Sequence, residues 1–160
     1  MRRFLSAIFN YSAGLRSGLL PRRAAAPKGA AVPGNFQEYK ASAEQGDAEA
    51  QFNLGFCYDD GRGVAKDYAE AVKWYRKAAG QNFAPAQFNL GYCYANGQGV
   101  ARDKVEAYAW FSMAAKADSD AAERRNLLRK EMTPKQFTDA QKRMKELRWQ
   151  IAAKSKPSTP

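Results

Sequence analysis

The chain has 160 residues, with 26 lysine and arginine side chains against 16 aspartate and glutamate side chains, and a hydrophobic content of 45%. This length suits one domain, and this hydrophobic content is enough for a packed core. The sequence has no histidine, only two cysteines and no long apolar run, which excludes the commonest general base, a four-ligand cysteine and histidine zinc site, and a transmembrane helix.

The first 34 residues form a basic segment with six basic and no acidic side chains. Residues 24–34 are rich in alanine, glycine and proline, which is typical of a linker. An arginine-rich, acid-free and amphipathic start is typical of a mitochondrial presequence. A secretory signal fits less well because Asn10, Ser12 and Arg16 interrupt the apolar run. A flexible basic arm of a bacterial protein is the third interpretation.

An internal repeat with a period of 36 residues occupies the middle of the chain. Residues 50–79 align with residues 86–115 without a gap, and 18 of the 30 aligned pairs are identical. A match of this quality at one register indicates duplicated structural units, and the period is typical of helix-pair solenoids. Residues 36–115 carry ten acidic and eight basic side chains, so the excess of positive charge lies at the two ends of the chain.

The first helix of each repeat is predicted from helical spacing of apolar residues. In the first unit, Leu54, Cys57 and Tyr58 share one face of a helix over residues 48–59. The glycine-rich segment 60–63 ends this helix, because glycine accepts left-handed backbone angles. The second unit repeats the pattern 36 residues later.

The second helix of each repeat begins at an aspartate. Asp67 is the predicted N-cap, and Glu70 stands three residues later in the capping-box position. Asp103 and Glu106 repeat this pair. The apolar face of the first of these helices consists of Ala71, Trp74, Tyr75 and Ala78, and that of the other consists of Ala107, Trp110, Phe111 and Ala114.

Gly55 and Gly91 occupy the same interior position of the two first helices. A glycine inside a helix costs about 0.8–1 kcal/mol relative to alanine. Since the glycine recurs, we expect a close approach of the neighbouring helix to offset that cost.

Capping helices are predicted on both sides of the repeats. Asn35 with Glu38 indicates a helix start, and the residues that follow align with the second helix of a repeat. Asp120 with Glu123 is interpreted as the start of another helix after the second repeat. A last amphipathic helix begins at Thr133, with proline at its first position, and its apolar stripe consists of Phe137, Ala140, Met144, Leu147 and Ile151.

Three blocks in each unit, A-x-A-Q-x-x-L-G-x-x-Y, G-x-G-V-x-x-D and A-x-x-W-x-x-x-A-A, resemble the Sel-one-like repeat family, a relative of the tetratricopeptide repeats. The resemblance covers roughly residues 43–115. It rests on Leu54, Gly55, Tyr58, Gly61, Gly63, Asp67, Trp74, Leu90, Gly91, Tyr94, Gly97, Gly99, Asp103 and Trp110. The closing segment from Thr133 also resembles that of many bacterial members, which favours the bacterial cytoplasm over the mitochondrial matrix.

The resemblance implies an all-α fold, a short right-handed α-solenoid of helix-turn-helix, tetratricopeptide-like repeats with capping helices. We expect the solenoid over residues 35–151, with repeats at about 43–78 and 79–115, caps over 120–151, and a disordered tail over 152–160. The family implies a non-catalytic scaffold that binds a protein or peptide partner in its concave groove, with no cofactor and no metal. Binding of nucleic acid or an anionic surface by the basic ends is the alternative, and an enzyme is not predicted.

The predicted partner-binding residues lie on the two first helices. Aromatic and amide side chains suit the recognition of a peptide or helix. The set consists of Gln51, Phe52, Asn53, Phe56, Gln87, Phe88, Asn89 and Tyr92. The sequence leaves open whether the aromatic members line the groove or pack between adjacent repeats.

Cys57 and Cys93 occupy equivalent positions in the two repeats. Packed helices lie about 8–10 Å apart, whereas a disulfide needs Cα atoms within about 7 Å. We therefore expect two reduced, buried thiols.

Overall fold

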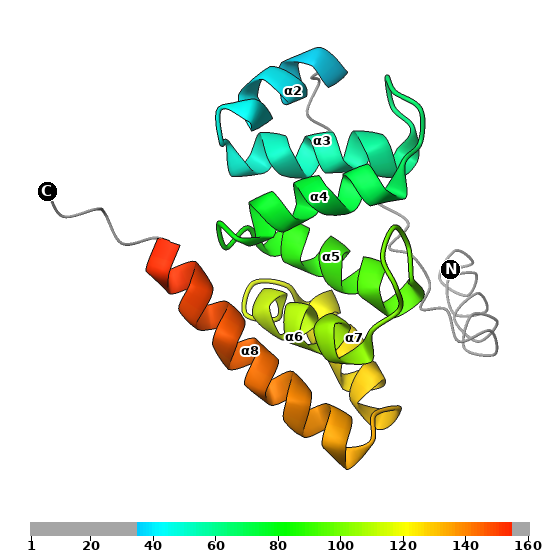
Figure 1. Ribbon diagram of the computed structural model, residues 1–160, viewed down its shortest axis with the longest axis vertical. Helices are drawn as coiled ribbons and strands as arrows, with labels where there is room; N and C mark the ends of the chain where they lie inside the picture. The colour runs from blue at the N-terminus through cyan, green and yellow to red at the C-terminus, as the bar shows by residue number, and fades with distance from the viewer. Residues whose placement is uncertain (1–34, 155–160) are drawn as a thin grey trace, which may run out of the picture.

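The computed structural model describes residues 35–154, which contain seven helices and no strand. The helices are α2 (Phe36–Glu44), α3 (Ala48–Asp60), α4 (Tyr68–Ala79), α5 (Ala84–Asn96), α6 (Lys104–Ala114), α7 (Ser119–Lys130) and α8 (Pro134–Lys154). Figure 1 shows α2 to α6 stacked in chain order along the long axis, with α8 running obliquely past the lower half of the stack. The predicted basic arm, residues 1–34, lies outside the described residues, as does 155–160.

Both repeats contain the two predicted helices. The first helices, α3 and α5, end at Gly61 and Gly97, which have left-handed backbone angles. The second helices, α4 and α6, begin at the predicted N-caps, because the carboxylates of Asp67 and Asp103 each accept hydrogen bonds from two backbone N–H groups. The fold is therefore an all-α solenoid of helical repeats, as the sequence predicts.

The predicted capping boxes of these second helices are incomplete. Glu70 does not return a bond to its N-cap, and its carboxylate pairs instead with Lys73 at 2.6 Å. The carboxylate of Glu106 bonds to Trp110 and to Arg143 of α8. In both repeats the glutamate therefore makes a side-chain contact instead of a backbone contact.

Helix α2 takes the place of a second helix in front of the first repeat. It begins with a complete capping box between Asn35 and Glu38. Its last carbonyl groups contact the next helix as those of α4 do, since Gln51 Nε2 donates to the carbonyl oxygen of Ala43 at 3.1 Å. Exactly one period later, Gln87 Nε2 donates to the carbonyl oxygen of Ala79 at 3.3 Å. This match confirms α2 as half of a repeat.

The interior glycines of the first helices allow an aromatic ring to approach the backbone. A Cβ atom on Gly55 would lie 2.8 Å from Cδ1 of Tyr75, and one on Gly91 would lie 2.9 Å from Cδ1 of Phe111. Both rings are fully buried. The predicted close approach of the second helix is therefore confirmed, and the contact is made by an aromatic side chain.

The start of α7 differs from the prediction. The N-cap is Asp118, whose carboxylate accepts from the N–H groups of Asp120 and Ala121. Asp118 precedes the unpaired N–H groups of the first turn, whereas Asp120 already lies within that turn. The helix consequently begins at Ser119, with its N-cap two residues before the predicted Asp120.

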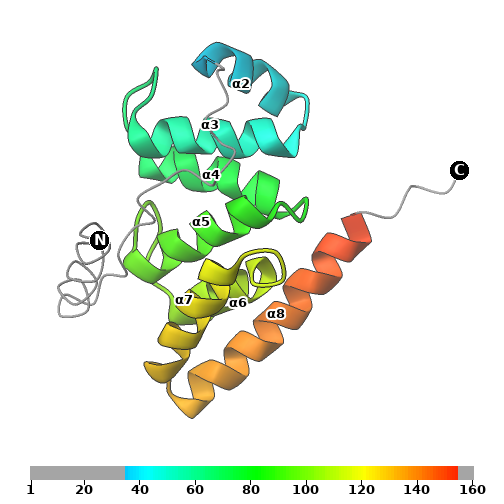
Figure 2. The same cartoon turned by 180° about the vertical axis from the view of Figure 1, so that it is seen from behind.

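Helix α8 closes the second repeat and begins as predicted. The Oγ1 atom of Thr133 accepts from the N–H of Gln136, and the Gln136 side chain accepts in return from the N–H of Thr133. The helix packs against α6 and continues to Lys154, three residues into the predicted disordered tail. Figure 2 shows α8 running back from the end of α7 past α6. Leu147 is buried in the main core cluster with Ala109 and Trp110 of α6.

Candidate functional site

Two of the aromatic residues predicted to bind a partner are core residues. Phe52 is 1% exposed, and its ring lies 5.9 Å from that of Tyr75 and 5.5 Å from that of Phe83, measured between centroids. Phe88 is 3% exposed, and its ring lies 5.6 Å from that of Phe111. Both side chains therefore pack in the core instead of lining a groove, and they offer a partner no surface.

The two predicted glutamines are structural links between successive helices. Gln51 and Gln87 are 5% and 1% exposed. The side-chain amide of each donates the hydrogen bond described above to the C-terminal end of the preceding helix. The side-chain oxygen Oε1 of Gln51 also accepts a hydrogen bond from Nε2 of Gln81. Buried amide groups need such partners, and using them for a ligand would break the stacking of the repeats.

The other four predicted residues form one stripe along α3 and α5, which we call the first-helix face: Asn53, Phe56, Asn89 and Tyr92. Phe56, Asn89 and Tyr92 are half-buried, and Asn53 is 7% exposed. Each pair is spaced at i and i+3, and the two pairs are one period apart. Within residues 35–154, the side-chain amides of Asn53 and Asn89 form no hydrogen bond. A guanidinium group, that of Arg62, lies 4.9 Å above the ring of Phe56.

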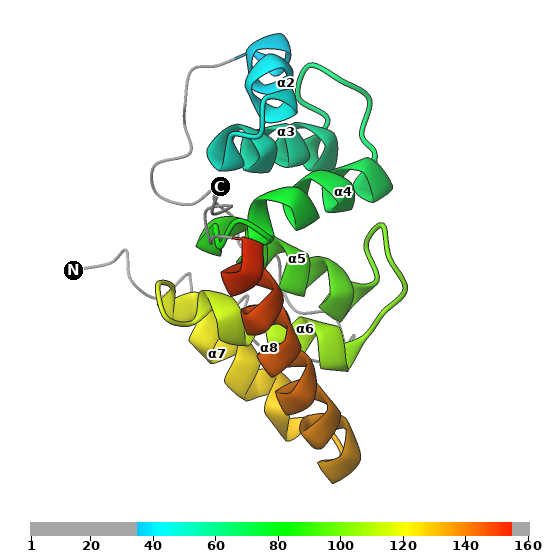
Figure 3. The ribbon, with the colours of Figure 1, turned by 60° about the vertical axis from the view of Figure 1, so that its left-hand side comes forward.

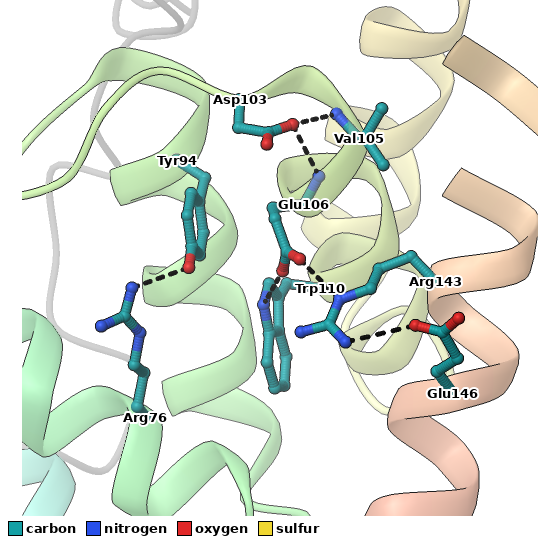
Figure 4. Close-up of polar contacts among 8 residues, drawn as sticks. All are labelled: Arg76, Tyr94, Asp103, Val105, Glu106, Trp110, Arg143 and Glu146. Carbon is teal, nitrogen blue, oxygen red and sulfur yellow. Dashed lines mark hydrogen bonds and ion pairs between the residues drawn. The ribbon is translucent and has the colours of Figure 1, made fainter. Parts of the chain in front are cut away.

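A polar cluster that the sequence did not predict fastens α8 to the second repeat (Figure 4). The Nε of Arg143 donates to Glu106 at 2.5 Å, and the other carboxylate oxygen of Glu106 accepts from Trp110 Nε1 at 3.0 Å. Burial alone would lower the pKa of Arg143, but its hydrogen bonds and ion pairs with Glu106 and Glu146 outweigh this and raise it. The only sequence signal for this contact was a glutamate one turn before a repeated tryptophan.

Arg76 joins the two repeats from the other side of the same region. Its guanidinium donates to the hydroxyl of Tyr94 at 2.8 Å and lies 5.7 Å from the centre of that ring (Figure 4). The tyrosine of the repeat motif therefore contacts the preceding repeat as well as its own core.

Cys57 and Cys93 are both buried, and no disulfide joins them. Burial raises the pKa of Cys57, with a further increase from Asp60, and the lowering effect of Arg62 is too small to cancel them. Within the described part of the chain, no group of three or more cysteine or acidic side chains could hold a metal ion.

Iodoacetamide should therefore alkylate both cysteines slowly in the folded protein and rapidly in urea. Thiolate is the major form only above the pKa, so the native reaction of Cys57 should accelerate at a higher pH than that of an exposed cysteine. Mass spectrometry of the denatured, unreduced protein should show two adducts. A chain with no adduct and a Cys57–Cys93 bond would contradict this expectation.

Comparison with known families and structures identifies the repeats. The Sel1 repeat family model matches residues 48–83 and 84–119. One similar crystal structure is that of c5321, a protective antigen of uropathogenic Escherichia coli strains that displays an SLR fold, with 36% identity over 78% of this chain and a TM-score of 0.68. Another is a Sel1 repeat protein from Oxalobacter formigenes, with 46% identity over 57% of this chain and a TM-score of 0.56.

The chain corresponds to only 29% and 38% of the lengths of these two solved proteins. Comparison with curated proteins gives no significant match. Across residues 35–154, no helix has both the length and the apolar character needed to cross a bilayer.

Proposed function

Because residues 48–119 are two Sel1 repeats, we propose that this chain is a non-catalytic scaffold that binds a peptide segment of a partner protein on the first-helix face. Sel1 repeat proteins are generally protein-interaction scaffolds, which supports the class of function. The observation that carries the choice of surface is the pair of amides, Asn53 and Asn89, that recurs one period apart without an internal hydrogen bond.

An extended peptide suits this arrangement. Each carboxamide can donate to a peptide carbonyl and accept from a peptide N–H. The neighbouring rings of Phe56 and Tyr92 offer half-buried aromatic surface for apolar side chains of the same peptide. A repeated amide and aromatic pair therefore provides both main-chain and side-chain recognition along the axis of the repeats.

Binding of nucleic acid, the alternative from the sequence, gains no support from the comparisons. Both similar solved proteins come from bacteria, which supports a bacterial over a mitochondrial origin.

The test is a random-peptide library selected on the full chain. Replacing Asn53 and Asn89 together by alanine should weaken the selected peptides by about tenfold or more, since each lost hydrogen bond is worth about 0.5–1.5 kcal/mol. Isothermal titration calorimetry measures the affinity, and circular dichroism checks the fold.

The matched control replaces Gln37 and Gln141, two exposed amide residues on α2 and α8, by alanine. This variant should bind like the unchanged protein. Equal affinity of the asparagine variant, with its fold intact, would remove the first-helix face from consideration.

A further inference from the structure

A second surface lies where the C-terminal ends of α4, α6 and α8 meet. It encloses a cavity of about 560 Å³, within the size range of ligand pockets, about 300–1,000 Å³. Figure 3 shows the end of α8 beside the turn between α4 and α5. We call this cavity the basic cleft, and it is lined by Lys77, Gly80, Gln81, Asn82, Met113, Lys116, Arg148, Ile151, Ala152 and Lys154. None of these residues belongs to the first-helix face.

The basic cleft carries four cationic side chains and no acidic one. Lys77, Lys116, Arg148 and Lys154 are all exposed, and none forms a hydrogen bond or ion pair with any residue in 35–154. Arg143 of the same helix α8, by contrast, is neutralised by its ion pair with Glu106. The ammonium group of Lys77 lies 3.6 Å from the centre of the Trp74 ring, but no acidic side chain neutralises it. The cleft is therefore a local concentration of positive charge, which attracts an anionic ligand.

The negative C-terminal ends of the three helices do not neutralise all of this positive charge. Each helix end carries about half an elementary negative charge, so the three ends together amount to less than two charges against four cations. A net positive potential remains for a ligand.

The floor of the basic cleft is apolar. Met113 of α6 and Ile151 of α8 are half-buried and line the cavity together with Ala152 and Gly80. The two polar side chains at its edge are already engaged. Gln81 donates to the carbonyl oxygen of Gly46 and to Gln51, and Asn82 accepts from Gln87. Recognition must therefore come from the cations and from the apolar floor.

These features favour a peptide over a nucleic acid or a lipid headgroup. Several of the last carbonyl groups of α4 and α6 already accept backbone hydrogen bonds, those of Ala78 and Ala114 among them, so recognition does not rest on them. An acidic peptide offers carboxylates to the cations and aliphatic side chains to the floor. A phosphate backbone or a lipid headgroup offers negative charge but no aliphatic side chain for the floor. The chain's own basic segment, with six cations and no acid in residues 1–34, has the wrong charge to occupy the cleft.

We propose that the basic cleft binds an acidic, leucine-containing peptide segment of a partner protein. Carboxylates of that segment pair with Lys77, Lys116, Arg148 and Lys154, and one aliphatic side chain rests on Met113 and Ile151. The site is separate from the first-helix face, so the scaffold can hold two segments at once.

The experiment measures fluorescence anisotropy of a labelled peptide of alternating glutamate and leucine with the full chain. Replacing Lys116 and Arg148 together by glutamate should weaken binding by about tenfold or more, because two attractive charge contacts become repulsive. The matched control replaces Lys142 and Lys145 by glutamate. Both lysines are exposed on α8, the helix of Arg148, but lie outside the cleft. This control makes the same change in net charge and should weaken binding less than about twofold.

A milder variant, Lys116→Gln with Arg148→Gln, keeps the test informative if charge reversal disturbs α8, and it should give a smaller loss in the same direction. Equal losses in the cleft variant and the control, or equal binding of a peptide with glutamine in place of glutamate, would overturn the proposal. So would single-stranded RNA or phosphatidylglycerol vesicles that bind more tightly than the peptide and lose binding in the cleft variant. Alanine at Asn53 and Asn89 should leave this affinity unchanged, which separates the basic cleft from the first-helix face.

Discussion

Alanine at position 99 is expected to destabilise the fold by about 3 kcal/mol or more, as the sum of backbone strain and overpacking. Gly99 has a left-handed φ of +68°, and a Cβ atom there would lie 2.2 Å from the carbonyl oxygen of Tyr68. That oxygen belongs to the first turn of α4, so it cannot rotate away as a side chain can. Urea unfolding of Gly99→Ala, followed by circular dichroism, measures the loss.

Gly63 provides the matched control because it is the equivalent residue of the first repeat. Its φ is +72°, but a Cβ atom there would lie 3.0 Å from the Cβ atom of Phe36, a much milder contact than that of Gly99. Phe36 belongs to α2, the first helix of the described stack, so a small movement of this helix relieves the contact. Gly63→Ala should therefore show the conformational strain, about 1–2 kcal/mol, without the backbone clash. Similar losses in the two variants would show that the contact of Gly99 with α4 is unimportant.

The repeat was sufficient to predict the helices and most of their ends. Asp67 and Asp103 mark helix starts through local chemistry, since a carboxylate in front of a helix accepts from its free N–H groups. The start of α7 was predicted too late because two aspartates, Asp118 and Asp120, compete for the same role.

The candidate site was harder to predict because a solenoid buries both sides of its first helices. Amphipathic spacing identified the core face around Leu54 but left open whether the aromatic residues on the other side pack between repeats or line the groove. In the structure, that other side is also covered, since Phe52 packs on Tyr75 and Phe83 and Gln51 bonds to Ala43 of α2. The apolar pattern of one helix does not reveal its contacts with a neighbouring repeat. On α3, only Asn53 and Phe56 of the predicted residues lie on the first-helix face.

The docking site of α8 has a signature in the repeat that the sequence analysis did not use. The outward side chains of α4 include the exposed Lys73 and Arg76, whereas the equivalent residues of α6 are Ala109 and Ser112, which are buried. Loss of two long basic side chains at one face of the second repeat makes room for another helix. Comparing what differs between two repeats thus predicts the capping contact, just as comparing what is identical predicts the fold.

Ala109 of the second repeat is equivalent to Lys73 of the first, and a lysine at position 109 should displace α8. Ala109 is 0% exposed and shares a core cluster with Leu147 of α8, so a lysine there would have to bury its ammonium group or displace the helix. We expect Ala109→Lys to cost about 2–3 kcal/mol or more through overpacking and desolvation. Thermal unfolding measures the loss, and limited trypsin digestion should cut α8 faster than in the unchanged protein.

The reciprocal substitution, Lys73→Ala, changes the equivalent position of α4, where the lysine is exposed and pairs only with Glu70. It should change stability by less than about 1 kcal/mol, as expected for a surface ion pair. If Ala109→Lys were no more damaging than Lys73→Ala, or if α8 resisted trypsin equally in both, the packing of α8 on α6 would contribute little to the fold. In that case α8 stays in place in both variants, and the basic cleft, which needs α8, should bind the acidic peptide equally in both. Loss of peptide binding in Ala109→Lys alone would link the capping helix directly to the second binding site.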